Sequence, residues 1–145
     1  MSAGENKAIA RRIPLEVFNA LGNLAVLDEV LAADFVDHSL PPDVPPGVEG
    51  IKQLARTWLA AFPDCQYTVE VDFAEGDLVA HRVTGRATMT GEFMGMPPTG
   101  KTATWTETHI IRFANGKIVE HWGNQDDLGM LQQLGLIPEP AQAGE

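Results

Sequence analysis

Apolar residues at helical spacing predict helices in the first part of the chain. Between residues 6 and 21, apolar side chains recur at every fourth position and form one stripe: Ile9, Ile13, Val17 and Leu21. Pro14 lies inside this stripe and removes one backbone hydrogen bond, so we expect the first helix to kink there. We expect a second helix from Asn23, a good capping residue, to about Asp34, and then a short extended piece over residues 35–38.

A third helix is expected after the proline-rich loop at residues 40–47. Its inward side carries four apolar residues, and Pro63 ends it: Ile51, Leu54, Trp58 and Phe62. Beyond this helix the apolar period changes from about four residues to two, which is typical of strands. We expect strands at 66–74, 78–90, 101–113 and 117–124, a loop at 91–100 and a short helix at 126–134.

This order of elements predicts the fold class. Helices that precede a run of mostly antiparallel strands indicate an α+β fold in which the helices cover one face of the sheet. A chain of 145 residues fits one domain, and we expect an ordered core over about residues 6–138 with a disordered tail after Pro138. Asn115-Gly116 joins the last two strands and is a strong hairpin signal.

The two-residue turn predicts a register for this hairpin. His109 then lies opposite Trp122, and Glu107 lies opposite Asn124. The same face is expected to carry further residues of both kinds: Trp105, Ile111, Phe113, Ile118 and Glu120. Because a buried face normally excludes polar groups that have no partner, this mixture predicts a lined pocket rather than a solid core.

Alternative roles are open for the ionisable residues of this region. His109 among apolar neighbours is compatible with a satisfied core histidine as well as with a catalytic one. Asp126 either caps the last helix or points into the pocket as a general base. Strand parity places His121 and Arg112 on the opposite face, and the orientation of His38 is open.

Composition narrows the classes of partner and cofactor. The net charge of -10, from 20 acidic and 10 basic residues, repels phosphate backbones and anionic lipids, so we expect neither nucleic acid nor a membrane as partner. The lone Cys65 cannot form an internal disulfide, and neither metal-ligand spacing nor a glycine-rich nucleotide loop is present. We therefore expect no metal and no cofactor, and, without a signal peptide or long apolar run, a cytoplasmic location.

Three stretches of the sequence resemble the SnoaL-like polyketide (ester) cyclases. They are residues 34–38 (DFVDH), 91–100 (GEFMGMPPTG) and 109–135 (HIIRFANGKIVEHWGNQDDLGMLQQLG), within a resemblance over about residues 6–138. The family implies a nuclear transport factor 2-like fold: a cone-shaped α+β barrel whose curved, mixed or antiparallel sheet wraps around helices and a deep apolar pocket. The chain departs from the family at Ile13-Pro14, where members often carry Phe-Tyr.

The resemblance also implies a chemistry and the residues that perform it. The acid–base aspartate of the family corresponds to Asp126, which would take a C–H proton next to a carbonyl. The pocket histidine corresponds to His109, which would hydrogen-bond the developing enolate oxygen. His38 lies where related steroid isomerases carry their base. The expected pocket-lining residues are His38, Trp122, Trp105, Phe18, Trp58, Phe93, Met96 and Asn124.

We therefore expect cofactor-independent acid–base catalysis, either an aldol-type cyclization or an isomerization, on a hydrophobic polyketide-like carbonyl compound. The alternative is a non-catalytic binding protein for an apolar small molecule, in which Asp126 is a solvent-facing cap. An epoxide hydrolase of the same fold is less favoured because residues 107–109 offer no Arg-x-Asp pattern. A long sheet with a second face to cover predicts a homodimer.

Overall fold

The computed structural model describes residues 2–138 and confirms the predicted α+β class. The elements are α1 (Ala3–Arg12), η1 (Ile13–Val17), α2 (Ala25–Val30), β1 (Leu31–Asp37), α3 (Gly47–Ala61), β2 (Gln66–Glu75), β3 (Leu78–Thr88), β4 (Thr102–Ala114), β5 (Lys117–Gln125) and α4 (Asp127–Gln133). The tail after Pro138 that was expected to be disordered lies outside the described residues.

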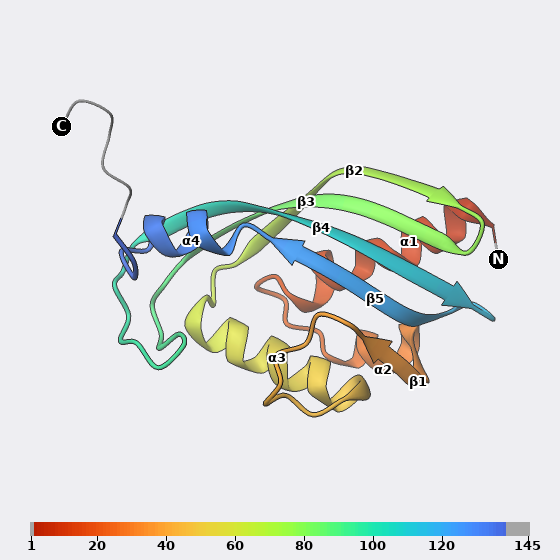
Figure 1. Ribbon diagram of the computed structural model, residues 1–145, viewed down its shortest axis with the longest axis horizontal. Helices are drawn as coiled ribbons and strands as arrows, with labels where there is room; N and C mark the ends of the chain where they lie inside the picture. The colour runs from red at the N-terminus through yellow and green to blue at the C-terminus, as the bar shows by residue number, and fades with distance from the viewer. Residues whose placement is uncertain (1, 139–145) are drawn as a thin grey trace.

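The five strands form one curved sheet in the order β1-β5-β4-β3-β2. Strand β1 runs parallel to β5 and the other pairs are antiparallel, so the sheet is mixed. It does not close into a barrel, because β1 and β2 remain as its two edges. Helices α1, α2 and α3 lie on one side of the sheet, and α4 follows β5 at one end (Figure 1).

The helical hydrogen-bond pattern changes at Pro14, the residue at which a kink was predicted. Regular α-helical hydrogen bonding ends at Arg12, and the chain continues through η1 in a wider turn. There the Phe18 N–H donates to the Ile13 carbonyl, five residues back, over 3.2 Å. A proline has no N–H to give to the carbonyl four residues earlier, so the helix changes its hydrogen-bond spacing at this residue.

The second helix is shorter than predicted and the following strand is longer. Helix α2 ends at Val30, and β1 already begins at Leu31, whereas the sequence pattern predicted helix to about Asp34. Leu31 and Phe35 are buried along β1. Strand β1 pairs in parallel with β5 as far as Asp37, which lies opposite His121. This pairing makes residues 31–34 a strand although their local spacing favours a helix.

The β4–β5 hairpin carries a bulge that the sequence pattern did not predict. Its turn has φ angles of 51° at Asn115 and 76° at Gly116, as expected of a two-residue hairpin loop. The first pairs follow the predicted register, but the register then shifts by one residue, because Val119 has no partner between Phe113↔Ile118 and Arg112↔Glu120. A shift of one residue turns every later side chain to the other face.

The predicted pairing of His109 with Trp122 and of Glu107 with Asn124 is therefore wrong. His109 lies opposite Gly123, and Glu107 lies opposite Gln125. The prediction that His121 lies on the face away from His109 is also wrong, because the two rings bond to each other.

Two separate hydrophobic clusters fill the space between the sheet and the helices. The first gathers around α1, α2 and β1 with Phe35, Ile111 and Phe113. The second surrounds Phe62 and Trp105 near the ends of α3 and α4. Among the helices of residues 2–138, none has the length and apolar character needed to cross a membrane.

Candidate functional site

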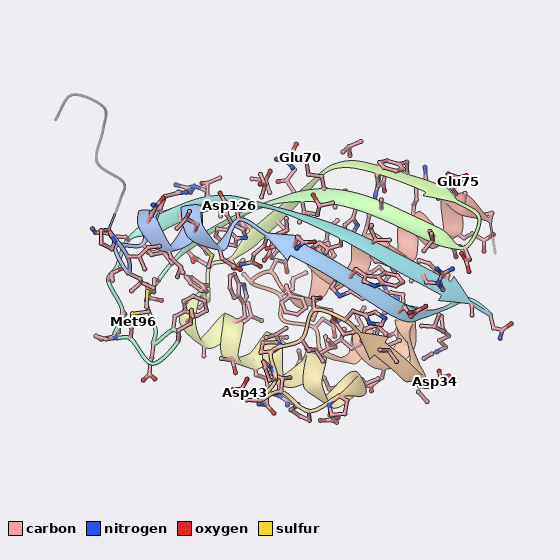
Figure 2. All side chains as sticks on the ribbon, in the orientation of Figure 1. Asp34, Asp43, Glu70, Glu75, Met96 and Asp126 are labelled. Carbon is pink, nitrogen blue, oxygen red and sulfur yellow. The ribbon has the colours of Figure 1, made fainter. Side chains whose placement is uncertain are left out.

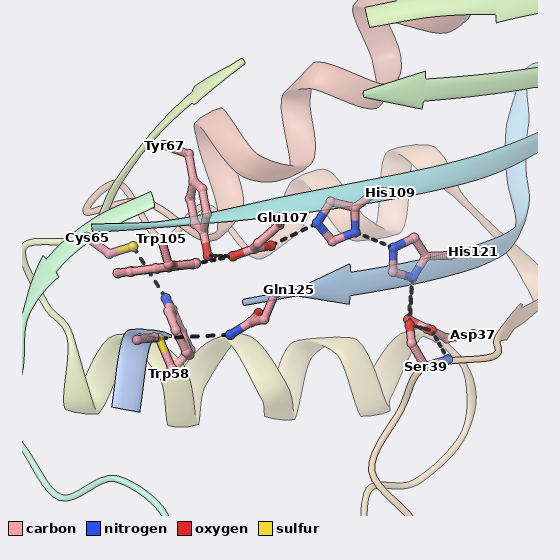
Figure 3. Close-up of polar contacts among 11 residues, drawn as sticks. Asp37, Ser39, Trp58, Cys65, Tyr67, Trp105, Glu107, His109, His121 and Gln125 are labelled. Carbon is pink, nitrogen blue, oxygen red and sulfur yellow. Dashed lines mark hydrogen bonds and ion pairs between the residues drawn. The ribbon is translucent and has the colours of Figure 1, made fainter. Parts of the chain in front are cut away.

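A line of hydrogen bonds crosses the inner face of the sheet from β2 to β1 (Figure 3). At its β2 end, the Tyr67 hydroxyl and the Trp105 indole N–H both donate to Oε2 of Glu107, each over 2.7 Å. Oε1 of Glu107 lies 2.8 Å from Nε2 of His109. Nδ1 of His109 lies 2.7 Å from Nε2 of His121.

The β1 end of this line is a second carboxylate. Nδ1 of His121 lies 2.9 Å from Oδ2 of Asp37, the last residue of β1. The Ser39 backbone N–H and hydroxyl both donate to Oδ1 of Asp37, over 2.8 and 2.7 Å. We name Glu107, His109, His121 and Asp37 the polar chain, in which two imidazoles stand between two carboxylates.

Glu107 is ionised although it is buried. Its side chain is 7% exposed. Burial by itself raises the pKa of Glu107, but the hydrogen bonds from His109, Trp105 and Tyr67 outweigh it and hold the pKa below its usual range. Burial, together with the charge of Glu107, keeps the pKa of Tyr67 well above its usual range, so the hydroxyl stays a donor. Glu107 therefore presents a fixed anionic acceptor to His109.

Asp37 has the same character at the other end. Its side chain is 5% exposed. Burial raises the pKa of Asp37, and the bonds from His121 and Ser39 lower it further than burial raises it. Both imidazoles thus face a carboxylate that stays charged at neutral pH, and every one of their four ring nitrogens has a partner in the protein.

A third imidazole lies beside the polar chain and was missed in the sequence. His81 on β3 is directly opposite His109 and meets it edge to face, with ring centroids 5.5 Å apart. It is 3% exposed, and its Nδ1 has no hydrogen-bond partner among the described residues. Burial, together with the charges of His109 and His121, lowers the pKa of His81 to about 4, so this ring is neutral at pH 7.

Aromatic side chains form a wall next to Glu107. Trp58 packs against Phe93 and Trp105 with ring centroids 5.7 and 5.5 Å apart, and Phe62 lies against the same rings. The structure thus brings together three of the predicted pocket residues, Trp58, Phe93 and Trp105. Trp58 and Phe93 are half-buried, so this wall is accessible in part.

A glycine makes room for the indole that bonds Glu107. A Cβ at Gly85 on β3 would lie 2.5 Å from Cζ2 of Trp105 and 2.8 Å from Cε1 of Tyr67. Real side chains do not approach this closely, so only glycine lets the Trp105 ring lie flat on β3 while its N–H reaches the carboxylate.

Asp126 lies at the surface as a helix cap. It is exposed, and its Oδ1 accepts the Gly129 N–H at the start of α4 over 3.0 Å. Figure 2 shows it where β5 meets α4. None of the hydrogen bonds of the polar chain involves Asp126. Of the two roles that the sequence left open, the structure displays the cap, and a role as general base remains a prediction.

Two other predicted pocket residues lie on the outer face of the sheet. Trp122 stacks on His38 with centroids 4.9 Å apart, and the Arg112 guanidinium lies 5.9 Å from the Trp122 ring. His38 bonds to Glu120, which also accepts from Arg112. The bulge at Val119 places this group away from the polar chain.

The remaining predicted pocket residues are scattered. Asn124 is exposed, Phe18 is half-buried against the first hydrophobic cluster, and Met96 pairs with Phe93 in the 91–100 loop. Cavities of about 160 and about 660 Å³ lie at the other end of the sheet beside the β4–β5 turn. Neither is lined by a predicted pocket residue, so the deep apolar pocket remains a prediction.

Sequence reasoning missed three members of the site. His121 was placed on the wrong face because the bulge leaves no sequence signal in the Asn-Gly turn. Asp37 lies in the extended piece predicted over residues 35–38, which was too short for its pattern to show which side chains face inward. Val79, His81 and Val83 occupy every second position of β3 and therefore share one face of the sheet. Because this face carries apolar residues, the period-two pattern would have placed His81 on the buried face.

Comparison with known proteins places the chain in a family. The family model described as SnoaL-like polyketide cyclase matches residues 8–134. Aklanonic acid methyl ester cyclase DnrD of Streptomyces peucetius is 35% identical over 62% of this chain and 63% of its own length, just under two thirds of that protein. Aklanonic acid methyl ester cyclase DauD of Streptomyces sp. (strain C5) is 31% identical over 82% of this chain and 72% of its own.

A solved structure agrees with this result. TsrD from Streptomyces laurentii superposes with a TM-score of 0.85 at 25% identity and covers 94% of this chain and 99% of its own. The fold is the nuclear transport factor 2-like fold expected from the sequence. The chain belongs to the SnoaL-like polyketide cyclase family.

Proposed function

We propose that this protein closes a ring in a polyketide-like carbonyl compound by acid–base catalysis centred on His109. The buried Glu107 carboxylate carries this proposal. It is held by two donors on one oxygen and aligns the His109 ring through the other. A carboxylate that fixes the tautomer and orientation of an imidazole is a recurrent arrangement in general acid–base catalysis.

The names of the relatives suggest the class of substrate. They are named as cyclases of aklanonic acid methyl ester, and a third relative as nogalonic acid methyl ester cyclase. We extend this class, the methyl ester of a polyketide-like acid, to this chain. The aromatic wall of Trp58, Phe93 and Trp105 beside Glu107 offers flat apolar surface for such a molecule.

Ring closure of this kind needs no external reactant. A C–H proton next to a carbonyl is removed, the enolate carbon bonds to a second carbonyl carbon, and the oxygen of that carbonyl takes a proton. Substrate and product have the same mass. The protein has to move one proton and stabilise one oxyanion, and preorganised donors next to a buried charge serve this purpose.

A turnover assay tests the proposal. Aklanonic and nogalonic acid methyl esters are incubated with the wild-type protein, and chromatography with mass detection follows a new species of unchanged mass. We expect conversion by the wild type and a loss of about 100-fold or more in kcat for His109→Gln. Conversion by His109→Gln at the wild-type rate would contradict the role of His109.

The exposed cap at Asp126 favours a second candidate function, a binding protein for the same apolar molecules, because that alternative predicted a solvent-facing Asp126. Calorimetric titration of the same esters distinguishes the two. Binding without conversion by the wild type supports the second candidate, and conversion excludes it.

A further inference from the structure

The contact between His109 and His121 is the one link of the polar chain that contains no carboxylate. The outer nitrogens of the two rings face Glu107 and Asp37 over 2.8 and 2.9 Å, and the inner nitrogens face each other over 2.7 Å. Each outer link holds a ring to a carboxylate that is fixed by further donors, whereas the inner contact only joins one ring to the other. A carbonyl compound that reaches the polar chain would therefore replace the contact between the rings.

Proton counting gives the state of this contact. Ionised Glu107 and Asp37 only accept, so each outer ring nitrogen must carry a proton. The inner contact needs one further proton, on one nitrogen, with a lone pair on the other. Three protons on two rings are one more than two neutral imidazoles hold. The pair of His109 and His121 therefore carries a single shared positive charge between two negative ones.

We propose that His121 is the second catalytic residue and that it forms one acid–base unit with His109, in which the two facing nitrogens supply one N–H donor and one bare base. This inference rests on the proposed function. The resemblance gave the proton-accepting role to Asp126, and this inference gives it to the ring that does not hold the shared proton. That ring is His121 when His109 holds the shared proton, and His109 when His121 holds it.

The reaction step balances within this unit. The bare nitrogen takes the C–H proton while the N–H of the other ring donates to the oxygen of the same carbonyl, which becomes the enolate oxygen. The enolate carbon bonds to the second carbonyl carbon, whose oxygen takes the transferred proton back from the imidazole. The unit ends with the one shared proton with which it began.

Two features of β5 bring the rings together. The bulge at Val119 turns His121 to the inner face. Gly123, opposite His109, then leaves space for both rings: a Cβ there would lie 2.8 Å from Nδ1 of His109 and 3.0 Å from Cε1 of His121. Gly123 is thus a positioning residue, because a side chain would occupy the place where the two imidazoles meet.

The other ionisable groups near the two rings do not change the number of protons that His109 and His121 carry. His81 of β3 faces His109 and is neutral at pH 7. Asp72 of β2, opposite His81, is held by Arg11 of α1 over 2.6 Å. On α3, the Lys52 ammonium bonds to Asp28 and Glu49.

Nuclear magnetic resonance of the ligand-free protein tests the shared proton without any substrate. Spectra of ¹⁵N-labelled histidine side chains are recorded between about pH 5 and 8. We expect protonated outer nitrogens on both rings, and inner nitrogens whose shifts lie between those of protonated and bare nitrogen. Gly123→Ala should separate the inner shifts and make the two rings titrate independently. Gly4→Ala, whose added methyl would have its nearest neighbour 4.0 Å away, should retain the wild-type spectrum.

Turnover of the esters tests the catalytic role. We expect His121→Gln to lower kcat by about 100-fold or more. Asp126→Asn should stay within about threefold of the wild type, because asparagine also caps a helix. Asp37→Asn removes a negative charge beside His121, so the limb of the pH–rate profile on which the shared proton is lost should move to lower pH. A merely structural role would lower the rate equally at all pH values.

Two results would overturn the inference: two neutral rings at pH 7 in the resonance experiment, or a large loss in Asp126→Asn with near wild-type turnover in His121→Gln. If the wild type converts none of the esters, the proposed function fails, and the spectra still decide whether the two rings share a proton.

Discussion

The ring of His81 meets the ring of His109 edge to face across β3 and β4, with centroids 5.5 Å apart. The two histidines nevertheless differ in environment. His109 has a carboxylate on one side and an imidazole on the other, whereas Nδ1 of His81 is buried without a partner among the described residues. This difference leads to a prediction about stability and pH.

His81 should make the protein less stable in mild acid. The unfolded chain takes up a proton on this ring below pH 6.5, and the folded chain does so only near its lowered pKa of about 4. Stability is therefore lost as the pH falls between these values, by about 3 kcal/mol in full. Urea unfolding at pH 7 and 4.5 should show a smaller loss in His81→Leu than in the wild type. Equal losses would show that His81 is not buried in its neutral form.

Glu107 should also cost stability as the pH falls, but in a lower pH range than His81. Its folded pKa lies below the ordinary 4.5, so its contribution is fully present above that pH and is lost as the pH falls through the lower folded value. We expect Glu107→Gln to lower the free energy of unfolding at pH 7 by about 1–3 kcal/mol. Urea unfolding should show the difference from the wild type shrinking towards pH 3. A difference that stays constant over this range would contradict the assignment of a buried, charged Glu107.

Gly85→Ala tests the space beneath Trp105. The added methyl would lie 2.5 Å from a ring atom of a fully buried indole, so the ring or the strand must shift. We expect a loss of about 1–3 kcal/mol in the free energy of unfolding, with a change in tryptophan fluorescence as the indole leaves Glu107. Gly4→Ala serves as the control, since helix α1 has room for the methyl. An unchanged midpoint in Gly85→Ala would show that the Trp105 position is not constrained in this way.

Asp126 should matter for stability through its cap. Asp126→Ala removes the acceptor for the Gly129 N–H and should cost about 1 kcal/mol, whereas Asp126→Asn should be nearly neutral. Thermal unfolding of the two variants measures this difference. If both variants were equally destabilised, the charge rather than the cap would be the stabilising feature.

The elements that the sequence predicted correctly are those that local chemistry decides. Local chemistry predicted an irregularity at Pro14 and the hairpin at Asn115 and Gly116, because a missing N–H and two positive φ angles act on the chain within a few residues. Tertiary pairing decided the rest. Strand β1 forms against helical spacing because β5 offers it a parallel partner.

The candidate site was predicted only in part for the same reason. Glu107 and His109 were correctly assigned to one inner face. They are two positions apart on β4, so they share a face whatever the register with β5 is. Their neighbours across the hairpin depend on register, and a single unpaired residue, Val119, exchanged Trp122 for His121. The Asn-Gly turn predicts the register only of the pairs next to it, and it does not predict a bulge further along the strands.

Solvent exchange at the substrate carbon tests the central claim most directly. A keto ester that lacks the second carbonyl cannot close its ring, and its C–H hydrogen next to the carbonyl can only be removed and returned. In D₂O the wild type should exchange this hydrogen for deuterium well above the buffer rate, and His109→Gln and His121→Gln should lose that exchange. Exchange in both variants at the wild-type rate, or none above buffer in the wild type, would contradict an acid–base unit made of these two rings.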